Sequence, residues 1–152
     1  MKLKTLLLFL AFALCSLQGS FAKTIKVLAI GNSFSEDAIE QNLYELGKAA
    51  GDEFIIGNLY IGGCPLKKHW YNAENDKGAY RYRKINADGK LVQKDNIKIS
   101  AAIAEEDWDY ISLQQASGVS GLTESYEPYL AYLVAYIKTL APGSKIVWHQ
   151  TW

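Results

Sequence analysis

Residues 24–35 read TIKVLAIGNSFS, and this stretch decides the fold. Its first part, Thr24 to Ile30, is apolar, rich in β-branched residues and followed by a glycine, which is typical of a short buried strand. A helical spacing of apolar residues starts soon afterwards, from about Glu36 to Ala50, and another glycine stands where that helix would end. The stretch therefore predicts a strand that turns into a helix, with Asn32 and Ser33 at the turn.

The rest of the chain continues this alternation of strands and helices. In chain order we expect a strand at 53–61, a looser segment at 64–76, a β-hairpin at 79–93, a short helix at 97–106, a strand at 108–115, a helix at 128–140 and a strand at 145–152. Such alternation favours an α/β fold with a mostly parallel sheet covered by helices on both faces. Ligands of these sheets bind beyond the carboxyl ends of the strands, so we look for a site there.

The first 22 residues are predicted to be a secretory signal peptide. Lys2 and Lys4 precede an apolar run that is too short to span a bilayer, and small residues then form a cleavage site. A lipoprotein signal through Cys15 is less favoured, because a large residue precedes that cysteine. We therefore expect one exported domain at 23–152, periplasmic or extracellular, with no transmembrane segment in the mature chain.

Composition excludes several classes of function. The 16 Lys and Arg residues balance the 16 Asp and Glu residues, and no basic stripe forms, so nucleic acid is not an expected partner. With two histidines and no Cys/His cluster, no metal or other cofactor is expected. Cys64 is the one cysteine of the mature chain, and we expect it to be a buried structural residue rather than a nucleophile.

Polar and glycine residues gather at the predicted carboxyl ends of the strands. They are Asn32-Ser33, Gly62-Gly63-Cys64, Gln114-Gln115 with Ser117, and Gln150-Thr151. One interpretation of Ser33 is a capping box with Glu36, in which the hydroxyl accepts from a helix amide; Ser35 could cap instead and free Ser33. The other is a nucleophile at a strand-to-helix turn, with backbone N–H groups nearby to stabilise an oxyanion. The polar ends of the other strands favour the second.

Three blocks in this order resemble the SGNH (GDSL-type) hydrolases. AIGNSFS resembles their first block, with Asn32 where Asp is more usual, and the glycine after the second strand resembles their second. DYISLQQAS sits where the third block supplies an oxyanion Asn. A branch of secreted bacterial members is similar throughout 23–152, with G-N-S-F, then G-G-C-x-L and a nearby His, then L-Q-Q-x-S-G.

The resemblance implies a flavodoxin-like three-layer α/β/α sandwich and a serine esterase. Its substrates would be small-molecule or carbohydrate esters, O-acetyl groups among them. Ser33 would be the nucleophile, and an oxyanion hole would form from its N–H, a glycine N–H and a glutamine. The implied oxyanion residues are Ser33, Gly62 or Gly63, and Gln115, with Gln114 as the alternative, while Asn32, Cys64, His69 and Ser117 would line the pocket.

The catalytic base is missing from this pattern. The family takes it from a late D-x-x-H block, and the chain ends before one occurs. His149 lies within the last predicted strand, and His69, after the glycine turn, could line the pocket. We therefore expect a C-terminally incomplete sandwich, the N-terminal portion of an SGNH-like domain, that is inactive alone although the full-length product would be an esterase.

Two alternatives to the esterase remain. One is a non-catalytic secreted module that binds a glycan or small molecule on the same fold. The other, a nucleotide or phosphate binder, is weaker because Gly31-Asn32-Ser33 lacks the glycine density of a phosphate loop. The hairpin sequence YRYRK, residues 80–84, could rim a substrate cleft or bind an anionic group, or be an ordinary amphipathic hairpin.

Overall fold

The computed structural model describes residues 23–151, so the predicted signal peptide lies outside the described residues. Six strands form one sheet in the order β4-β3-β2-β1-β5-β6. They are β1 (Thr24–Gly31), β2 (Glu53–Tyr60), β3 (Tyr80–Ile85), β4 (Leu91–Ile97), β5 (Tyr110–Gln114) and β6 (Lys145–His149). The β2-β1-β5-β6 part is parallel, and β3 and β4 add an antiparallel hairpin at one side. The predicted mostly parallel sheet is confirmed.

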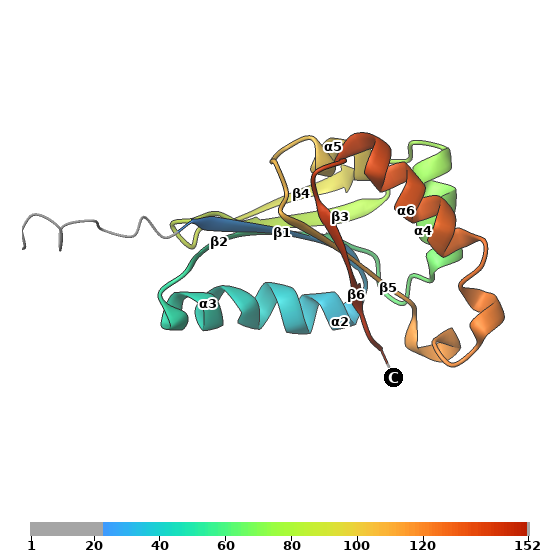
Figure 1. Cartoon of the computed structure of the whole chain (residues 1–152), viewed down its shortest axis with the longest axis horizontal. Coiled ribbons are helices and arrows are strands. Elements are labelled where there is room, and N and C mark those ends of the chain that lie inside the picture. The colour runs from blue at the N-terminus through green and yellow to red at the C-terminus, as the bar shows by residue number, and fades with distance from the viewer. Residues whose placement is uncertain (1–22, 152) are drawn as a thin grey trace, which may run out of the picture.

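Helices cover both faces of this sheet. They are α2 (Ser33–Ser35), the π-helix η1 (Glu36–Leu43), α3 (Tyr44–Ala50), α4 (Leu66–Glu74), α5 (Ile99–Ile103), the short 3-10 turns η2 (Ser117–Val119) and η3 (Thr123–Ser125), and α6 (Tyr129–Leu140). Figure 1 shows α2 and α3 along one face of the sheet and α4, α5 and α6 on the other. This is the α/β sandwich expected from the sequence. Within residues 23–151, no helix is both long and apolar enough to cross a bilayer.

The core lies against β1 and β5, the central parallel strands. Leu28, Ile30, Ile111 and Leu113 are each at most 1% exposed. Because helices cover both faces, residues on both sides of these strands are mostly apolar, which explains the apolar runs in the sequence. The predicted helix at 36–50 in fact begins at Ser33 and is wound as a π-helix in its middle.

The segment expected to be loose, residues 64–76, contains the helix α4. Pro65 precedes its first residue, and Leu66, His69 and Ala73 recur at helical spacing on its buried face. That pattern was available in the sequence, but adjacent lysines and aromatic residues obscured it. The correction matters for the site, because it decides which way His69 points.

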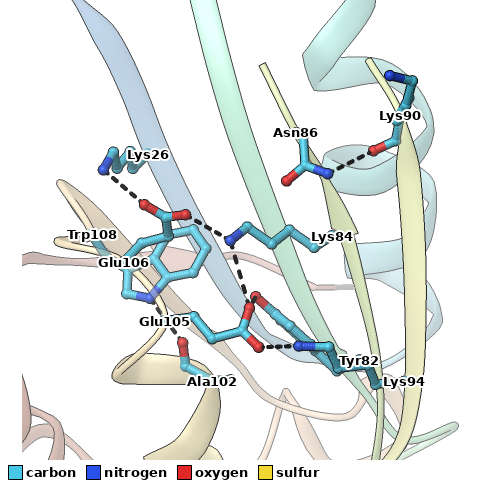
Figure 2. A network of polar contacts seen from close by, with 10 residues as sticks. All are labelled: Lys26, Tyr82, Lys84, Asn86, Lys90, Lys94, Ala102, Glu105, Glu106 and Trp108. Carbon is cyan, nitrogen blue, oxygen red and sulfur yellow. Dashed lines mark hydrogen bonds and ion pairs between the residues drawn. The ribbon is translucent and has the colours of Figure 1, made fainter. Parts of the chain in front are cut away.

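We call the end of the sheet where the parallel strands begin the amino edge, and the end where they finish the carboxyl edge. At the amino edge, a network of ion pairs joins the hairpin β3-β4 to the rest of the sheet. Glu106 contacts Lys26 of β1 at 2.8 Å and Lys84 of β3 at 2.6 Å. Glu105 contacts Lys94 of β4 at 2.6 Å and accepts a hydrogen bond from the Tyr82 hydroxyl at 3.2 Å. Figure 2 shows how these side chains join the hairpin to the loop before β5.

Candidate active site

Ser33 is the first residue of α2, and its side chain is exposed. Neither its hydroxyl nor its N–H hydrogen-bonds to any of residues 23–151. The helix is capped instead by Asn32, whose Oδ1 accepts from the Phe34 N–H at 3.2 Å. The capping-box interpretation of Ser33 is therefore wrong, and Glu36, its proposed partner, pairs with Arg81 at 2.7 Å.

Ser35 does not cap the helix either. It is fully buried, and its Oγ lies 2.7 Å from the carbonyl oxygen of Asn32 and 2.9 Å from Oδ1 of Asn58. Since Ser35 is held by these contacts and Asn32 occupies the cap, Ser33 is the serine of this turn that faces solvent.

Asn32 ties together the ends of three strands. Besides capping the helix after β1, its Oδ1 accepts from Nε2 of Gln114 at the end of β5, and its Nδ2 donates to the carbonyl of Cys64, beyond β2, at 3.4 Å. Only 1% of Asn32 is exposed, so it supports the site from below rather than lining an open pocket as expected. Gly31 allows this close packing, since a Cβ there would lie 2.6 Å from Oε1 of Gln114.

The glycine turn after β2 presents free backbone donors beside this junction. The Cys64 N–H donates to the Ile61 carbonyl at 3.3 Å, and Gly63 has a φ of 60°, a conformation that favours glycine. The Ile61 N–H donates to the Gly31 carbonyl at 3.2 Å, which holds the turn next to the Ser33 segment. Among the described residues, the N–H groups of Gly62 and Gly63 have no acceptor.

The two glutamines have different roles. Nε2 of Gln115 donates to the carbonyl and to the hydroxyl of Ser125, both at 3.0 Å, and its Oε1 accepts from the N–H of Leu66 at 3.0 Å. Gln115 therefore fastens the β5 end to α4 and η3, and its amide is not free to serve an oxyanion as expected. Gln114 contacts the Ser33 turn through Asn32, and in the described part of the chain Asn32 is its one side-chain partner, so it is the better placed of the two.

His69 lies in the core and does not line a pocket. Its exposed fraction is 0%, and its Nδ1 is 2.9 Å from the Tyr80 hydroxyl. Burial lowers the pKa of His69 to about 4, which keeps the imidazole neutral at pH 7. The expectation that it lines the pocket is wrong, because α4 turns this side chain toward the sheet.

The structure also shows the environments of Cys64, Ser117 and His149. Cys64 is buried, and burial raises the pKa of its thiol to about 12, which argues against a thiolate nucleophile. Ser117 is exposed in η2, just beyond the end of β5. His149 pairs in register with Gln114, and burial lowers its pKa. Within residues 23–151, no side chain hydrogen-bonds to the Ser33 hydroxyl, and no group of three His, Cys, Asp or Glu side chains is placed to hold a metal ion.

Residues 26–152 match the family model described as a domain of unknown function, DUF4886. The chain belongs to the DUF4886 family. It is similar to a solved DUF4886 family protein from Bacteroides uniformis ATCC 8492, with 51% sequence identity and a TM-score of 0.83. That match covers 86% of this chain and 51% of the solved chain, so this chain spans about half the length of its solved relative. No curated protein matches the sequence. The family description names no activity, so the chemistry rests on the site.

Proposed function

We propose that this DUF4886 chain carries the nucleophile and the oxyanion donors of an exported SGNH-type serine esterase. The observation that carries the proposal is the exposed Ser33 hydroxyl at a helix N-terminus, left unbonded because Asn32 takes the cap. A serine displayed in this way can attack an ester carbonyl once a base accepts its proton. The substrates would be acyl esters, with O-acetylated carbohydrates among them.

The oxyanion donors would come from the backbone. The Ser33 N–H and the N–H groups of Gly62 and Gly63 have no partners among the described residues, and the Ile61 and Cys64 contacts hold both segments at one junction. Such preorganised donors stabilise the negative charge that develops on the carbonyl oxygen. Gln114 is 1% exposed, as Asn32 is, so we propose that it supports the donors from below through Asn32 rather than contacting the oxyanion itself.

The base would come from outside the described residues. His69 is buried and neutral, and His149 makes no hydrogen bond to Ser33. Serine without a base is a weak nucleophile. The 152-residue chain alone is therefore expected to leave a short-chain aryl ester intact, and Ser33-dependent hydrolysis by it would contradict this assignment of the base.

The test uses an alkyl fluorophosphonate probe on the full-length gene product. Mass spectrometry is expected to find the label on Ser33, and Ser33→Ala is expected to abolish it. Ser100→Ala removes a serine of α5, on the other face of the sheet, whose hydroxyl donates to Asp76, and is expected to label as the wild type does. No label on the wild type, or an undiminished label on Ser33→Ala, would overturn the esterase.

The buried state of His69 favours one alternative function. A chain with the donors but no base in place can bind an acyl or carbohydrate ligand without cleaving it. Fluorophosphonate labelling distinguishes this binding module from the esterase. A binding module would bind its ligand as the full-length protein but would not be labelled.

A further inference from the structure

Three buried polar side chains lie beneath the Ser33 turn, on the face of the sheet along which α2 and α3 run (Figure 1). They belong to Ser35, Asn58 and Glu40, which are 0%, 0% and 7% exposed, and we call them the polar row. Buried polar groups are costly unless each is hydrogen-bonded, and a set that is bonded together fixes one arrangement of its neighbours. The contacts of the polar row show what it holds in place.

The winding of η1 brings Ser35 and Glu40 to the same face. Glu40 follows Ser35 by five residues, and a π-helix repeats its hydrogen bonds at that spacing, whereas an α-helix repeats them every four residues. An α-helical winding would turn Ile39 toward that face instead. Segments of π-helix are rare and are frequent at functional sites. Here the winding puts a carboxylate, rather than an apolar side chain, under the turn.

Glu40 decides which way the amide of Asn58 faces. A carboxylate can only accept hydrogen bonds, and Oε2 of Glu40 lies 2.9 Å from Nδ2 of Asn58, so this nitrogen is the donor. The other carboxylate oxygen pairs with Nη1 of Arg83, which is in register with Asn58 on β3 and balances the buried charge. Oδ1 of Asn58 is thereby turned toward Ser35.

The amide oxygen of Asn58 in turn holds Ser35. It lies 2.9 Å from the Ser35 Oγ, which is also 2.7 Å from the Asn32 carbonyl. That carbonyl already accepts the N–H groups of Ser35 at 3.0 Å and Glu36 at 3.3 Å, so the hydroxyl proton is available to Asn58. Ser35 belongs with Ser33 to the three-residue helix α2, so holding Ser35 also holds the backbone from which Ser33 projects.

We propose that Asn58 is a positioning residue of the Ser33 site and that Glu40 sets its orientation. Neither side chain hydrogen-bonds to Ser33, and both are buried away from a substrate. They act through Ser35, which keeps the Ser33 hydroxyl in one place relative to the free N–H groups of the glycine turn. This role rests on the proposed function, because a misplacement of about 1 Å can cost an enzyme about a hundredfold in rate.

Two buried serines provide a matched pair of test variants. Ser35 and Ser144 are both at most 3% exposed, and each hydroxyl lies 2.7 Å from a backbone carbonyl, but Ser144 contacts Trp108 at the amino edge. In the full-length gene product, Ser35→Ala is expected to slow the fluorophosphonate labelling of Ser33 by about tenfold or more, per molecule of folded protein. Ser144→Ala is expected to leave the rate unchanged. A wild-type rate in Ser35→Ala, or equal losses in both variants, would overturn the proposal.

Exchanging the two side chains tests Asn58 and Glu40 without emptying the buried site. Asn58→Asp alone puts a second carboxylate against Glu40 and is expected to slow labelling by about tenfold or more. Glu40→Gln alone leaves the orientation of Asn58 open, because a glutamine amide can donate or accept, and is also expected to slow labelling. The double variant again sets one amide against one carboxylate, and Arg83 lies beside both positions. It is expected to recover most of the wild-type rate, and a double variant as slow as Asn58→Asp would overturn the orienting role.

Backbone motion separates this proposal from the esterase itself. The ¹⁵N order parameters of Ser33 and Phe34 report the order of the turn without any chemistry. They are expected to fall in Ser35→Ala and to keep their wild-type values in Ser144→Ala. This loss of order in a protein whose wild type never labels would overturn the esterase and support the role of Asn58 in holding the turn. A labelled wild type whose order parameters and labelling rate are unchanged in Ser35→Ala would overturn the positioning role alone.

Discussion

The two edges of the sheet differ in how their polar groups are used. At the amino edge there is a cleft of about 1120 Å³, and several of the charged groups on its walls pair with one another. Lys23 lies 2.6 Å from Asp109, and Lys26 lies 2.8 Å from Glu106. At the carboxyl edge, Ser33 and the glycine turn are exposed and their donors are unused.

This difference shows that unused donors, rather than the size of a hollow, mark the candidate site. Paired charges near a surface gain little from a ligand, because a ligand would have to replace contacts that already exist. A ligand that binds an exposed hydroxyl and free N–H groups has only to displace water. The carboxyl ends of parallel strands are also where this class of sheet binds ligands. The two edges thus divide into one that holds the hairpin and one that is available to a substrate.

Lowering the pH should destabilise the fold in two steps, first through His69 and then through the amino edge. The first step is the largest effect that we expect. Burial holds the folded pKa of His69 at about 4, against an ordinary value of 6.5. Between these values the unfolded chain binds a proton that the native chain does not, so the free energy of unfolding falls as pH drops from about 6.5 to 4. The loss is at most about 3–4 kcal/mol, at about 1.4 kcal/mol for each pKa unit.

The amino edge should respond only at lower pH. Hydrogen bonds from Lys26 and Lys84 lower the pKa of Glu106, and Lys23 lowers that of Asp109. Their contribution is present above the ordinary carboxyl pKa and is lost as pH falls through the lowered values.

Urea unfolding at pH 7, 5.5 and 4.5 tests the His69 step. The free energy of unfolding of the wild type should fall with pH over this range, and His69→Gln should strongly reduce that slope. His149→Gln, at a half-buried site with a pKa shift of the same sign, should reduce it less; a His69→Gln curve parallel to the wild type would contradict the assignment.

Removing the junction side chain at the carboxyl edge should affect both stability and reactivity. Asn32→Ala takes the cap from the Phe34 N–H and the acceptor from the buried Gln114 amide. Losing a cap costs about 1 kcal/mol, and a buried unsatisfied amide about 1–3 kcal/mol, so we expect about 3 kcal/mol in all. Fluorophosphonate labelling of Ser33 in the full-length protein should fall by about tenfold or more, since the side-chain contacts that join the turn to Gln114 and to Cys64 are then lost.

A matched asparagine in the same helical segment provides the control. Asn42 is exposed, and among residues 23–151 its side chain hydrogen-bonds only to the carbonyl of Asp37. Asn42→Ala should therefore change the free energy of unfolding by less than about 0.5 kcal/mol and leave labelling intact. Equal labelling in Asn32→Ala and the wild type would show that the three strand ends position Ser33 without this side chain.

The sequence could predict the elements and the location of the site better than the contacts within it. Local signals were sufficient for β1 and for the hairpin around Asp88-Gly89. They could not choose the cap, because Asn32, Ser33 and Ser35 are all competent caps by residue type. The selection of Asn32 depends on Gln114 and Cys64, which are far away in sequence.

The two glutamines show a similar limit. Neighbouring residues of a strand point to opposite faces, so sequence alone could not say which of Gln114 and Gln115 faces Ser33. The answer required the position of Ser125, which holds Gln115. The pairing of Arg81 with Glu36, 45 residues earlier, likewise follows from the register of β2 with β3 and from no local pattern.

The smallest effect should come from the amino edge, and it tests the comparison most directly. Glu106→Gln removes two partly buried ion pairs and should cost about 1 kcal/mol, with a smaller difference from the wild type at high salt. Asp88→Asn breaks the exposed pair with Lys90 and should cost nothing measurable. The ion pairs of Glu106 are with Lys26 and Lys84, and neither lysine belongs to the carboxyl edge. Labelling of Ser33 should therefore be unchanged in Glu106→Gln. A loss of labelling without a matching loss of folded protein would mean that the network of ion pairs also positions the nucleophile, and the division between a fastening edge and a binding edge would then fail.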